Sequence, residues 1–436
     1  MENPMIRKTL AGAMALLAST AIGAQAQTIP ATVDQPVTIT YYNYNLASTG
    51  NGADATRRMI ADFEAANPNI KVEGIGASSA ELTSRVQADI AANRVPDVVQ
   101  MVFSDLAYGV DNLGVVGLED IVPQAELAAH FQGMSPKGLK LGVLNGKTYG
   151  LAYTFSTPVL FYNADLFRKA GLNPDQPPKT WAEVKAAALA IRDKTDAEGI
   201  AAGIFGPSAG DWLFQGVVRS NNGAILSDDR KTLTFAEPAA VEAVAMLRDL
   251  YDSEAYTNLD VTAAMEGMAA GTIGMYLQTS AIQGFLVRGA EGKFDLRATT
   301  MPRFGDKPQR PNNSGSALVI MAKDPVKQRA AWELMKHMTS KEAYTIITRD
   351  IGYLPLRAEI VDDPAYLGEW VKTHPLVRPN LEQLEMLEPW TSFPGPNYRQ
   401  IQKIMMEGAE MAVFGGMDPA EAMKAAQDTA QTMMPK

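Results

Sequence analysis

The chain of 436 residues contains no cysteine and only three histidines, and both shortages exclude whole classes of chemistry. Without cysteine there can be no disulfide, thiolate zinc site, iron–sulfur cluster or cysteine nucleophile. The histidines at positions 130, 337 and 374 lie too far apart in sequence to share one helix as in an H-E-x-x-H zinc motif. The carboxylates are scattered rather than clustered, so we expect no bound metal and no cofactor.

The chain also lacks an excess of positive charge. It has 39 basic and 49 acidic residues, for a formal charge of −10. This balance argues against nucleic acid or an anionic membrane as the main partner.

Long hydrophobic runs are missing everywhere except near the N-terminus. There the basic residues Arg7 and Lys8 precede an apolar run over residues 10–22, and residues 24–26 (AQA) match a small-x-small cleavage site. The pattern predicts a Sec-type signal peptide over residues 1–26 and therefore export to the periplasm. Cleavage would leave 410 residues with a net charge of −11. No later segment offers the roughly 18 unbroken apolar residues of a membrane span.

What the sequence does contain is an alternation of strand and helix patterns, in two series. The first series predicts strands at 37–42, 70–72 and 98–102, with helices at 53–66 and 80–93 between them. This βαβαβ order indicates a parallel sheet. The second series predicts strands at 159–162, 199–205, 274–277 and 317–321 and helices at 211–220, 238–251 and 325–338, followed by two terminal helices. We therefore predict an α/β fold with two lobes, each built on its own sheet.

One short motif, residues 206–210 (GPSAG), matches the G-x-S-x-G turn that presents a nucleophilic serine in α/β-hydrolases. A secreted serine hydrolase using Ser208 is therefore an alternative from a different functional class. Pro207 is an unsuitable occupant of that strained turn, and a simple Gly/Ser loop is the preferred interpretation.

A second motif, residues 146–148 (GKT), matches the end of a P-loop. The first glycine of that motif would have to stand at position 141, which is Leu141. A β-hairpin turn at Asn145 and Gly146 explains the segment better.

Aromatic and small polar residues gather where the predicted strands end. Tyr42 lies at the end of the first strand, Ser79 follows the second and Ser104 follows the third. Carboxyl ends of parallel strands meet at one edge of a sheet, where open α/β sheets bind ligands. Aromatic rings pack on the C–H faces of sugars, and hydroxyl or amide groups bond their hydroxyls.

Several longer motifs resemble a known family. The most specific is residues 156–163 (STPVLFYN) running through 167–172 (FRKAGL) to 176–181 (QPPKTW), and weaker matches are 67–68 (NP), 352–355 (GYLP) and 418–422 (DPAEA). Along essentially the whole predicted mature chain, the sequence resembles family 1 extracellular solute-binding proteins of bacterial ABC importers. Within the family it is most similar to the members that bind glycerol-3-phosphate.

The resemblance implies a two-lobed periplasmic-binding-protein fold whose hinge closes the interlobe cleft on a ligand. It places 27–155 and 316–352 in the N-terminal lobe and 156–315 and 353–436 in the C-terminal lobe. It also implies a monomer that performs no catalysis and whose closed form is recognised by the membrane permease.

The resemblance also suggests ligand-binding positions. Together with Tyr42 from the strand-end pattern, the candidates are Ser79, Ser104, Ser156, Trp212, Thr279, Gly315 and Tyr353. The phosphate-binding members carry an arginine in a late loop, which is replaced here near Pro394, and Arg399 is expected to begin the following helix. Loss of a bidentate guanidinium disfavours a phosphate. We therefore expect the substrate-binding component of an importer for a sugar or polyol, with glycerol-3-phosphate or a glycerophosphodiester, held by Arg399 or another base, as the alternative.

Overall fold

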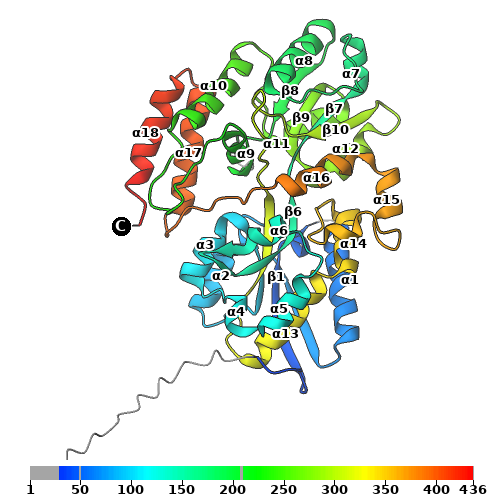
Figure 1. Cartoon of the computed structure of the whole chain (residues 1–436), viewed down its shortest axis with the longest axis vertical. Coiled ribbons are helices and arrows are strands. Elements are labelled where there is room, and N and C mark those ends of the chain that lie inside the picture. The colour runs from blue at the N-terminus through cyan, green and yellow to red at the C-terminus, as the bar shows by residue number, and fades with distance from the viewer. Residues whose placement is uncertain (1–28, 49–50, 207–209, 436) are drawn as a thin grey trace, which may run out of the picture.

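The computed structural model of the chain describes residues 29–48, 51–206 and 210–435, which form two lobes (Figure 1). The predicted signal peptide over 1–26 and Ser208 of the candidate hydrolase motif lie outside these residues. Within the described ranges, no helix combines the length and the apolar character needed to cross a membrane.

The sheet of the N-terminal lobe has the strand order β2-β1-β3-β11-β6. Its strands are β1 (Val37–Asn43), β2 (Ile70–Gly76), β3 (Val98–Val102), β6 (Gly150–Ser156) and β11 (Ser314–Ile320). The first three are mutually parallel and are connected by α1 (Asn51–Ala66) and α2 (Leu82–Ala91), so the predicted βαβαβ unit is confirmed. The last two are added antiparallel to their neighbours.

The C-terminal lobe is built on a second sheet with the order β10-β7-β9-β8. Its strands are β7 (Pro158–Asn163), β8 (Glu198–Ala202), β9 (Ile273–Thr279) and β10 (Leu296–Thr300). Side chains of β7 alternate between two apolar clusters, with Leu160 and Tyr162 in one and Val159 and Phe161 in the other. Both faces of this sheet are therefore covered.

The longer helices begin where the local sequence satisfies their free backbone N–H groups. Thr180 and Glu183 form a reciprocal capping box at α8, and Asp418 caps α18 with a proline in its first turn. The longer helices not yet bounded are α8 (Trp181–Lys194), α9 (Trp212–Ser220), α10 (Pro238–Asp252), α11 (Val261–Ala270), α13 (Pro325–Met338), α17 (Tyr398–Val413) and α18 (Pro419–Gln431). The shorter helices are α3 (Leu106–Tyr108), α4 (Leu118–Ile121), α5 (Gln124–Phe131), α6 (Pro136–Leu139), α7 (Ala164–Lys169), α12 (Gln283–Ala290), α14 (Lys341–Ile346), α15 (Gly368–Thr373) and α16 (Arg378–Glu382).

The GKT segment forms a small hairpin, as predicted. Strands β4 (Val143–Leu144) and β5 (Lys147–Thr148) pair antiparallel across Asn145 and Gly146. Both turn residues have positive φ, 50° and 78°, as a two-residue type I′ turn requires. The segment therefore does not form a P-loop.

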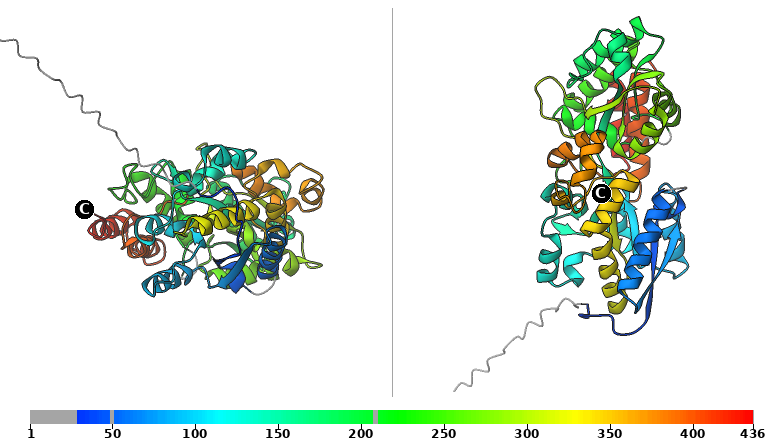
Figure 2. Two further views of the ribbon diagram at one scale, coloured as in Figure 1. Left: turned by 90° about the horizontal axis from the view of Figure 1, so that it is seen from below. Right: turned by 90° about the vertical axis from the view of Figure 1, so that its right-hand side faces the viewer.

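Three chain segments connect the lobes, which lie one above the other in the right panel of Figure 2. The first is Thr157, between β6 of one sheet and β7 of the other. The second and third, residues 311–313 and 388–390, run side by side: Asn313 N donates to Glu388 O at 3.1 Å, and Glu388 N donates to Pro311 O at 2.9 Å.

The third crossing lies later than the expected boundary between residues 352 and 353. Leu354 N donates to the carbonyl of Phe155 at the end of β6, at 2.7 Å, so the chain remains on the N-terminal lobe. The apolar side chains that follow pack into the core of this lobe, among them Leu354, Leu356, Ile360, Leu367 and Leu387. Helix α16 then packs against β7 and β10 of the C-terminal sheet, and apolar side chains enter the C-terminal core again from Phe393 onward.

Candidate functional site

A pocket of about 600 Å³ lies between the two lobes. The N-terminal lobe contributes Tyr44, Ser79, Ala80, Val102, Ser104, Asp105, Ser314, Gly315 and Tyr353. The C-terminal lobe contributes Gly210, Trp212, Arg399 and Gln402, together with Trp390, which ends the third connecting segment and bonds to Asp211 of this lobe. Five of the eight candidate ligand-binding residues are in this lining: Ser79, Ser104, Trp212, Gly315 and Tyr353. The other three lie elsewhere.

The wall from the N-terminal lobe rests on a buried polar network. The hydroxyl of Tyr44, directly after β1, is 2.7 Å from Thr154 Oγ1 and 3.1 Å from Ser316 Oγ. Gln100 is fully buried and donates to the same two hydroxyls, while its Oε1 accepts from the backbone N–H of Tyr44. Three strands thus hold the Tyr44 ring at the pocket.

Tyr42 does not line the pocket. It lies within β1, and its hydroxyl donates to Asp89 Oδ2 of α2 at 2.8 Å. Burial, together with this carboxylate, raises the pKa of Tyr42 to about 12. Tyr44 is the tyrosine that reaches the pocket, because the strand ends at Asn43 and the chain then turns.

Ser156 and Thr279 lie behind the pocket at the lobe crossing. Their hydroxyl oxygens are 2.5 Å apart, and Ser156 Oγ is also 3.3 Å from Ser314 Oγ. Ser156 ends β6 of one lobe and Thr279 ends β9 of the other. The pair therefore joins the two sheets directly.

Gly315 occupies a position that only glycine fits. Its φ is +103°, and an added Cβ would lie 1.9 Å from the carbonyl oxygen of Thr154 on the neighbouring strand. The backbone of Gly315 consequently forms part of the pocket surface, with Tyr353 beside it. Burial raises the pKa of Tyr353 well above its usual value, so its hydroxyl stays protonated.

On the C-terminal side, a buried carboxylate organises the wall. Asp211 is 1% exposed, and its Oδ1 accepts from Trp390 Nε1 at 2.7 Å and from Gln402 Nε2 at 2.8 Å. Its Oδ2 accepts from Gln215 Nε2 at 2.8 Å. Burial raises the pKa of Asp211 to about 6, although the hydrogen bonds from Gln215 and Trp390 act in the opposite direction. Asp211 thereby fixes two side chains of the pocket lining.

One ion pair crosses the pocket. Asp105, in the turn after β3, accepts from Arg399 Nη2 at 2.9 Å and from Tyr398 Oη at 2.7 Å, both at the start of α17. Arg399 thus begins the helix, as expected, and also reaches the cleft. Asp105 and Arg399 are the only formally charged members of the lining among the described residues, and they have opposite signs.

The candidates taken from the sequence omit several residues of this site, Trp390 among them. Tyr44, Asp105 and Gln402 line the pocket, and Asp211 supports it from behind. Tyr44 and Asp105 each stand within two residues of a candidate, so inspecting whole strand-end segments would have included them. No local signal marks Asp211 or Gln402, because the pocket-lining partners of Asp211, Trp390 and Gln402, are distant from it in sequence.

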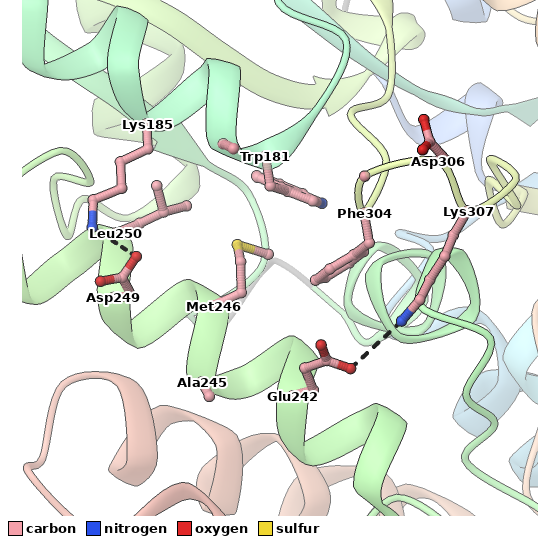
Figure 3. A pocket seen from close by; sticks show the side chains of 12 residues that line it. Trp181, Lys185, Glu242, Ala245, Met246, Asp249, Leu250, Phe304, Asp306 and Lys307 are labelled. Carbon is pink, nitrogen blue, oxygen red and sulfur yellow. Dashed lines mark hydrogen bonds and ion pairs between the residues drawn. The ribbon is translucent and has the colours of Figure 1, made fainter.

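A larger pocket of about 990 Å³ lies elsewhere, between α8 and α10 (Figure 3). Trp181, Met246 and Phe304 converge on it, with the ion pairs Lys185–Asp249 (2.7 Å) and Lys307–Glu242 (3.5 Å) at its margins. All its residues belong to the C-terminal lobe, so a ligand there would not join the lobes. We therefore take the smaller interlobe pocket as the candidate site.

The interlobe pocket provides rings, hydroxyls, an amide and one internal ion pair. Its lining contains no histidine, so among the described lining residues no serine has an imidazole base beside it. In the described part of the chain, no three histidine or carboxylate side chains gather in a way that could hold a metal. This arrangement is suited to binding a polar ligand by many weak contacts.

Comparison with known proteins gives a family match. A family model described as bacterial extracellular solute-binding protein matches residues 58–379. The sn-glycerol-3-phosphate-binding periplasmic protein UgpB of Yersinia enterocolitica is 32% identical over 213 residues, 47% of this chain. The chain spans about half the length of that relative, 48%. UgpB of Escherichia coli K12 is 24% identical over 415 residues, which cover 91% of this chain and 92% of that protein.

Solved structures share the fold. The cyclic alpha-maltosyl-1,6-maltose binding protein from Arthrobacter globiformis superposes with a TM-score of 0.79 and 22% identity, covering 91% of this chain and 98% of that one. UgpB from Mycobacterium tuberculosis in complex with glycerophosphocholine gives 0.78 and 21%, with the same coverage of 91% and 98%. The predicted two-lobed α/β fold is thus confirmed.

Proposed function

The chain belongs to the bacterial extracellular solute-binding protein family, and from that premise we propose that its interlobe pocket binds a neutral sugar or polyol. The lining of the pocket carries this proposal. It presents two indole rings, Trp212 and Trp390, together with several hydroxyls and the Gln402 amide, and the two charges among its described residues pair with each other. Flat rings suit the C–H faces of a sugar, and hydroxyl and amide groups suit its hydroxyls.

Binding would be coupled to lobe closure. A ligand in the pocket contacts Ser79 and Ser104 from one lobe and Trp212 and Trp390 from the other. Such a ligand has all its contacts only when the lobes are together, so its differential affinity favours the closed state. The three connecting segments and the Ser156–Thr279 pair would act as the hinge.

The same proposal covers location and partners. The predicted signal peptide and the periplasmic relatives support a periplasmic protein that delivers its ligand to the membrane subunits of an ABC permease. We assign it no catalytic step, because the family consists of substrate-binding proteins. The monomeric state is part of the proposal.

A thermal-shift screen of the exported chain against monosaccharides, disaccharides, polyols and glycerol phosphates tests the ligand class. We expect a neutral sugar or polyol to raise the melting temperature, and Trp212→Ala to abolish that rise. Trp370→Ala is the matched control, because Trp370 stacks on His374 in the N-terminal lobe at 4.3 Å and lies outside the pocket. Stabilisation by none of the neutral compounds would refute the proposed ligand class.

A phosphate ester is the second candidate ligand. It is favoured by the position of Arg399 in the lining and by the names of the relatives that bind sn-glycerol-3-phosphate. Calorimetry with sn-glycerol-3-phosphate on wild type and Arg399→Ala separates the cases. If Arg399→Ala binds sn-glycerol-3-phosphate as tightly as wild type, Arg399 does not hold the phosphate.

The serine hydrolase alternative has little support. Ser208 lies outside the described residues, and the family of the chain is one of binding proteins. Labelling by a fluorophosphonate probe that disappears in Ser208→Ala would be required to restore it.

A further inference from the structure

We propose that Asp105 determines which ligand charge the cleft accepts, by holding the Arg399 guanidinium across the lobe interface so that anionic ligands are rejected. This inference rests on the proposed function of the interlobe pocket and specifies its substrate class. The distance between Asp105 Oδ2 and Arg399 Nη2 is 2.9 Å. Asp105 lies just after β3 of the N-terminal lobe, and Arg399 lies in the first turn of α17.

The Asp105 carboxylate is buried and fully bonded. The residue is 3% exposed. Its Oδ1 accepts from the Tyr398 hydroxyl at 2.7 Å, and its Oδ2 accepts from Arg399 and from the hydroxyl of Thr83 on α2. Thr83 comes from the same lobe as Asp105, whereas Tyr398 and Arg399 come from the other. The carboxylate is thus positioned by its own lobe and bonded by the opposite one.

A second contact supports the same arrangement. The ring of Tyr108 on α3 stacks on that of Tyr398, with centroids 5.2 Å apart and planes 26° apart. Gln87 Nε2 of α2 donates to the Tyr108 hydroxyl at 2.6 Å. The start of α17 is therefore held against the N-terminal lobe by a ring contact as well as by charge.

The Arg399 guanidinium is already committed to this cluster. Its Nη2 donates to Asp105 and its Nε donates to the Tyr398 hydroxyl at 2.9 Å. Burial alone would lower the pKa of Arg399, but the Asp105 carboxylate and the Tyr398 hydroxyl together outweigh burial and raise it. Asp105 and the Tyr398 hydroxyl occupy the Nη2 and Nε donors, so a phosphate could approach the guanidinium only through its remaining N–H groups. At those groups the phosphate would lie beside the buried Asp105 carboxylate, and two neighbouring anions repel each other.

The rest of the described lining offers an anion no other cation. Among the described lining residues, Arg399 is the single positive charge and Asp105 the single negative one. Neutralising Asp105 while leaving Arg399 would change the formal charge of the pocket from zero to +1. The Asp105 carboxylate thus decides whether the pocket accepts an anionic ligand.

The test is calorimetry with sn-glycerol-3-phosphate and with inorganic phosphate on wild type, Asp105→Asn and Asp105→Asn/Arg399→Gln. We expect Asp105→Asn to bind sn-glycerol-3-phosphate at least 10-fold more tightly than wild type, and the double variant to lose that gain. Asp120→Asn is the matched control, because Asp120 pairs with Lys147 on the surface and lies outside the pocket. The affinity of Asp120→Asn for sn-glycerol-3-phosphate should equal that of wild type. Asp105→Ser is the second variant, used if Asp105→Asn fails to fold by circular dichroism.

Three results would overturn the inference. They are an unchanged phosphate-ester affinity in the folded Asp105 variants, a gain that persists without Arg399, and micromolar binding of sn-glycerol-3-phosphate by wild type that requires Arg399. The proposed function fails separately, through the absence of neutral-ligand binding by wild type. A gain in Asp105→Asn without any neutral ligand for wild type would uphold the inference and reject the sugar. Sugar binding by wild type, without a gain in phosphate-ester affinity in Asp105→Asn, would uphold the proposed ligand class and reject the role of Asp105.

Discussion

The indole nitrogen of Trp390 donates a hydrogen bond to the carboxylate of Asp211 at 2.7 Å, and this contact fixes one wall of the cleft. The same carboxylate oxygen accepts from Gln402. Both donors line the pocket, whereas Asp211 lies behind them with 1% of its surface exposed. Asp211 is therefore a positioning residue, which acts on a ligand only through its two neighbours.

Asp211→Ala should weaken ligand binding without touching the ligand. The indole and the amide would lose their common partner and sample other rotamers, and we expect affinity to fall roughly 10-fold, the effect of about 1.4 kcal/mol. Calorimetry with the ligand found in the screen measures the loss. Asp249→Ala is the control, because Asp249 is an exposed partner of Lys185 outside the interlobe pocket. Equal affinities for Asp211→Ala and wild type would contradict the positioning role.

The fold was predictable wherever local pattern decides structure. The alternation of strand and helix signals between residues 37 and 102 leads to the parallel unit β1-β2-β3, and Thr180 with Glu183 marks the start of α8. The third crossing was not predictable in this way. Leu354, Leu356 and Ile360 are apolar residues that either lobe could bury, and the sequence alone does not indicate which core they join.

The candidate site likewise contains some residues that local sequence identifies and others that it does not. Ser79 and Ser104 were identified because strand-end geometry depends on local order. Asp105, the next residue, was not, because its significance comes from Arg399, which is 294 positions away. Asp211 likewise acquires its role from Trp390 and Gln402, which are 179 and 191 positions away. Such pairings are set by the docking of the two lobes and not by neighbouring residues.

Gly315→Ala should be strongly destabilising. The substitution places a Cβ 1.9 Å from Thr154 O and forces an L-residue into a φ of +103°, so β11 would have to separate from β6. We expect a loss of about 3 kcal/mol or more of unfolding free energy, measured by urea denaturation. Gly114→Ala measures the cost of a positive φ alone, because Gly114 has a φ of +78° with nothing within 4 Å of an added Cβ. It should cost only about 1 kcal/mol. Equal costs would show that the close contact is unimportant.

Stability should fall in acid because of His130. Burial, and then the charges of Arg357 and Lys336, lower the pKa of His130 to about 3. An unfolded histidine has a pKa near 6.5, so between about pH 6.5 and pH 3 the unfolded state binds the additional proton. The free energy of unfolding contributed by this group is therefore fully present above pH 6.5 and is lost as the pH falls toward 3.

Urea denaturation from pH 7 to pH 4 measures this dependence. His130→Gln removes the titrating ring and should flatten the curve, by up to about 1.4 kcal/mol per pH unit. The exposed His374 provides the control, and His374→Gln should leave the slope as in wild type. His337, whose pKa is also lowered by burial, will retain part of the slope in both variants. A His130→Gln curve as steep as that of wild type would assign the acid sensitivity to other groups.

Tyr398→Phe should shift the lobes toward separation. The variant keeps the ring that stacks on Tyr108 but removes the hydroxyl that donates to Asp105. A hydrogen bond to a charged group contributes about 1.5–3 kcal/mol, and this one is made only when the lobes are together. Without ligand, small-angle scattering should therefore give a larger radius of gyration for the variant than for wild type, and ligand affinity should fall by about 10-fold because less of the protein is closed.

Tyr162→Phe is the control: it loses a similar hydrogen bond, to Pro174 O at 2.8 Å, but entirely within the C-terminal lobe. It should lower the melting temperature while leaving both the radius and the affinity unchanged, so a Tyr398 variant that behaves like the Tyr162 variant would refute a role in joining the lobes.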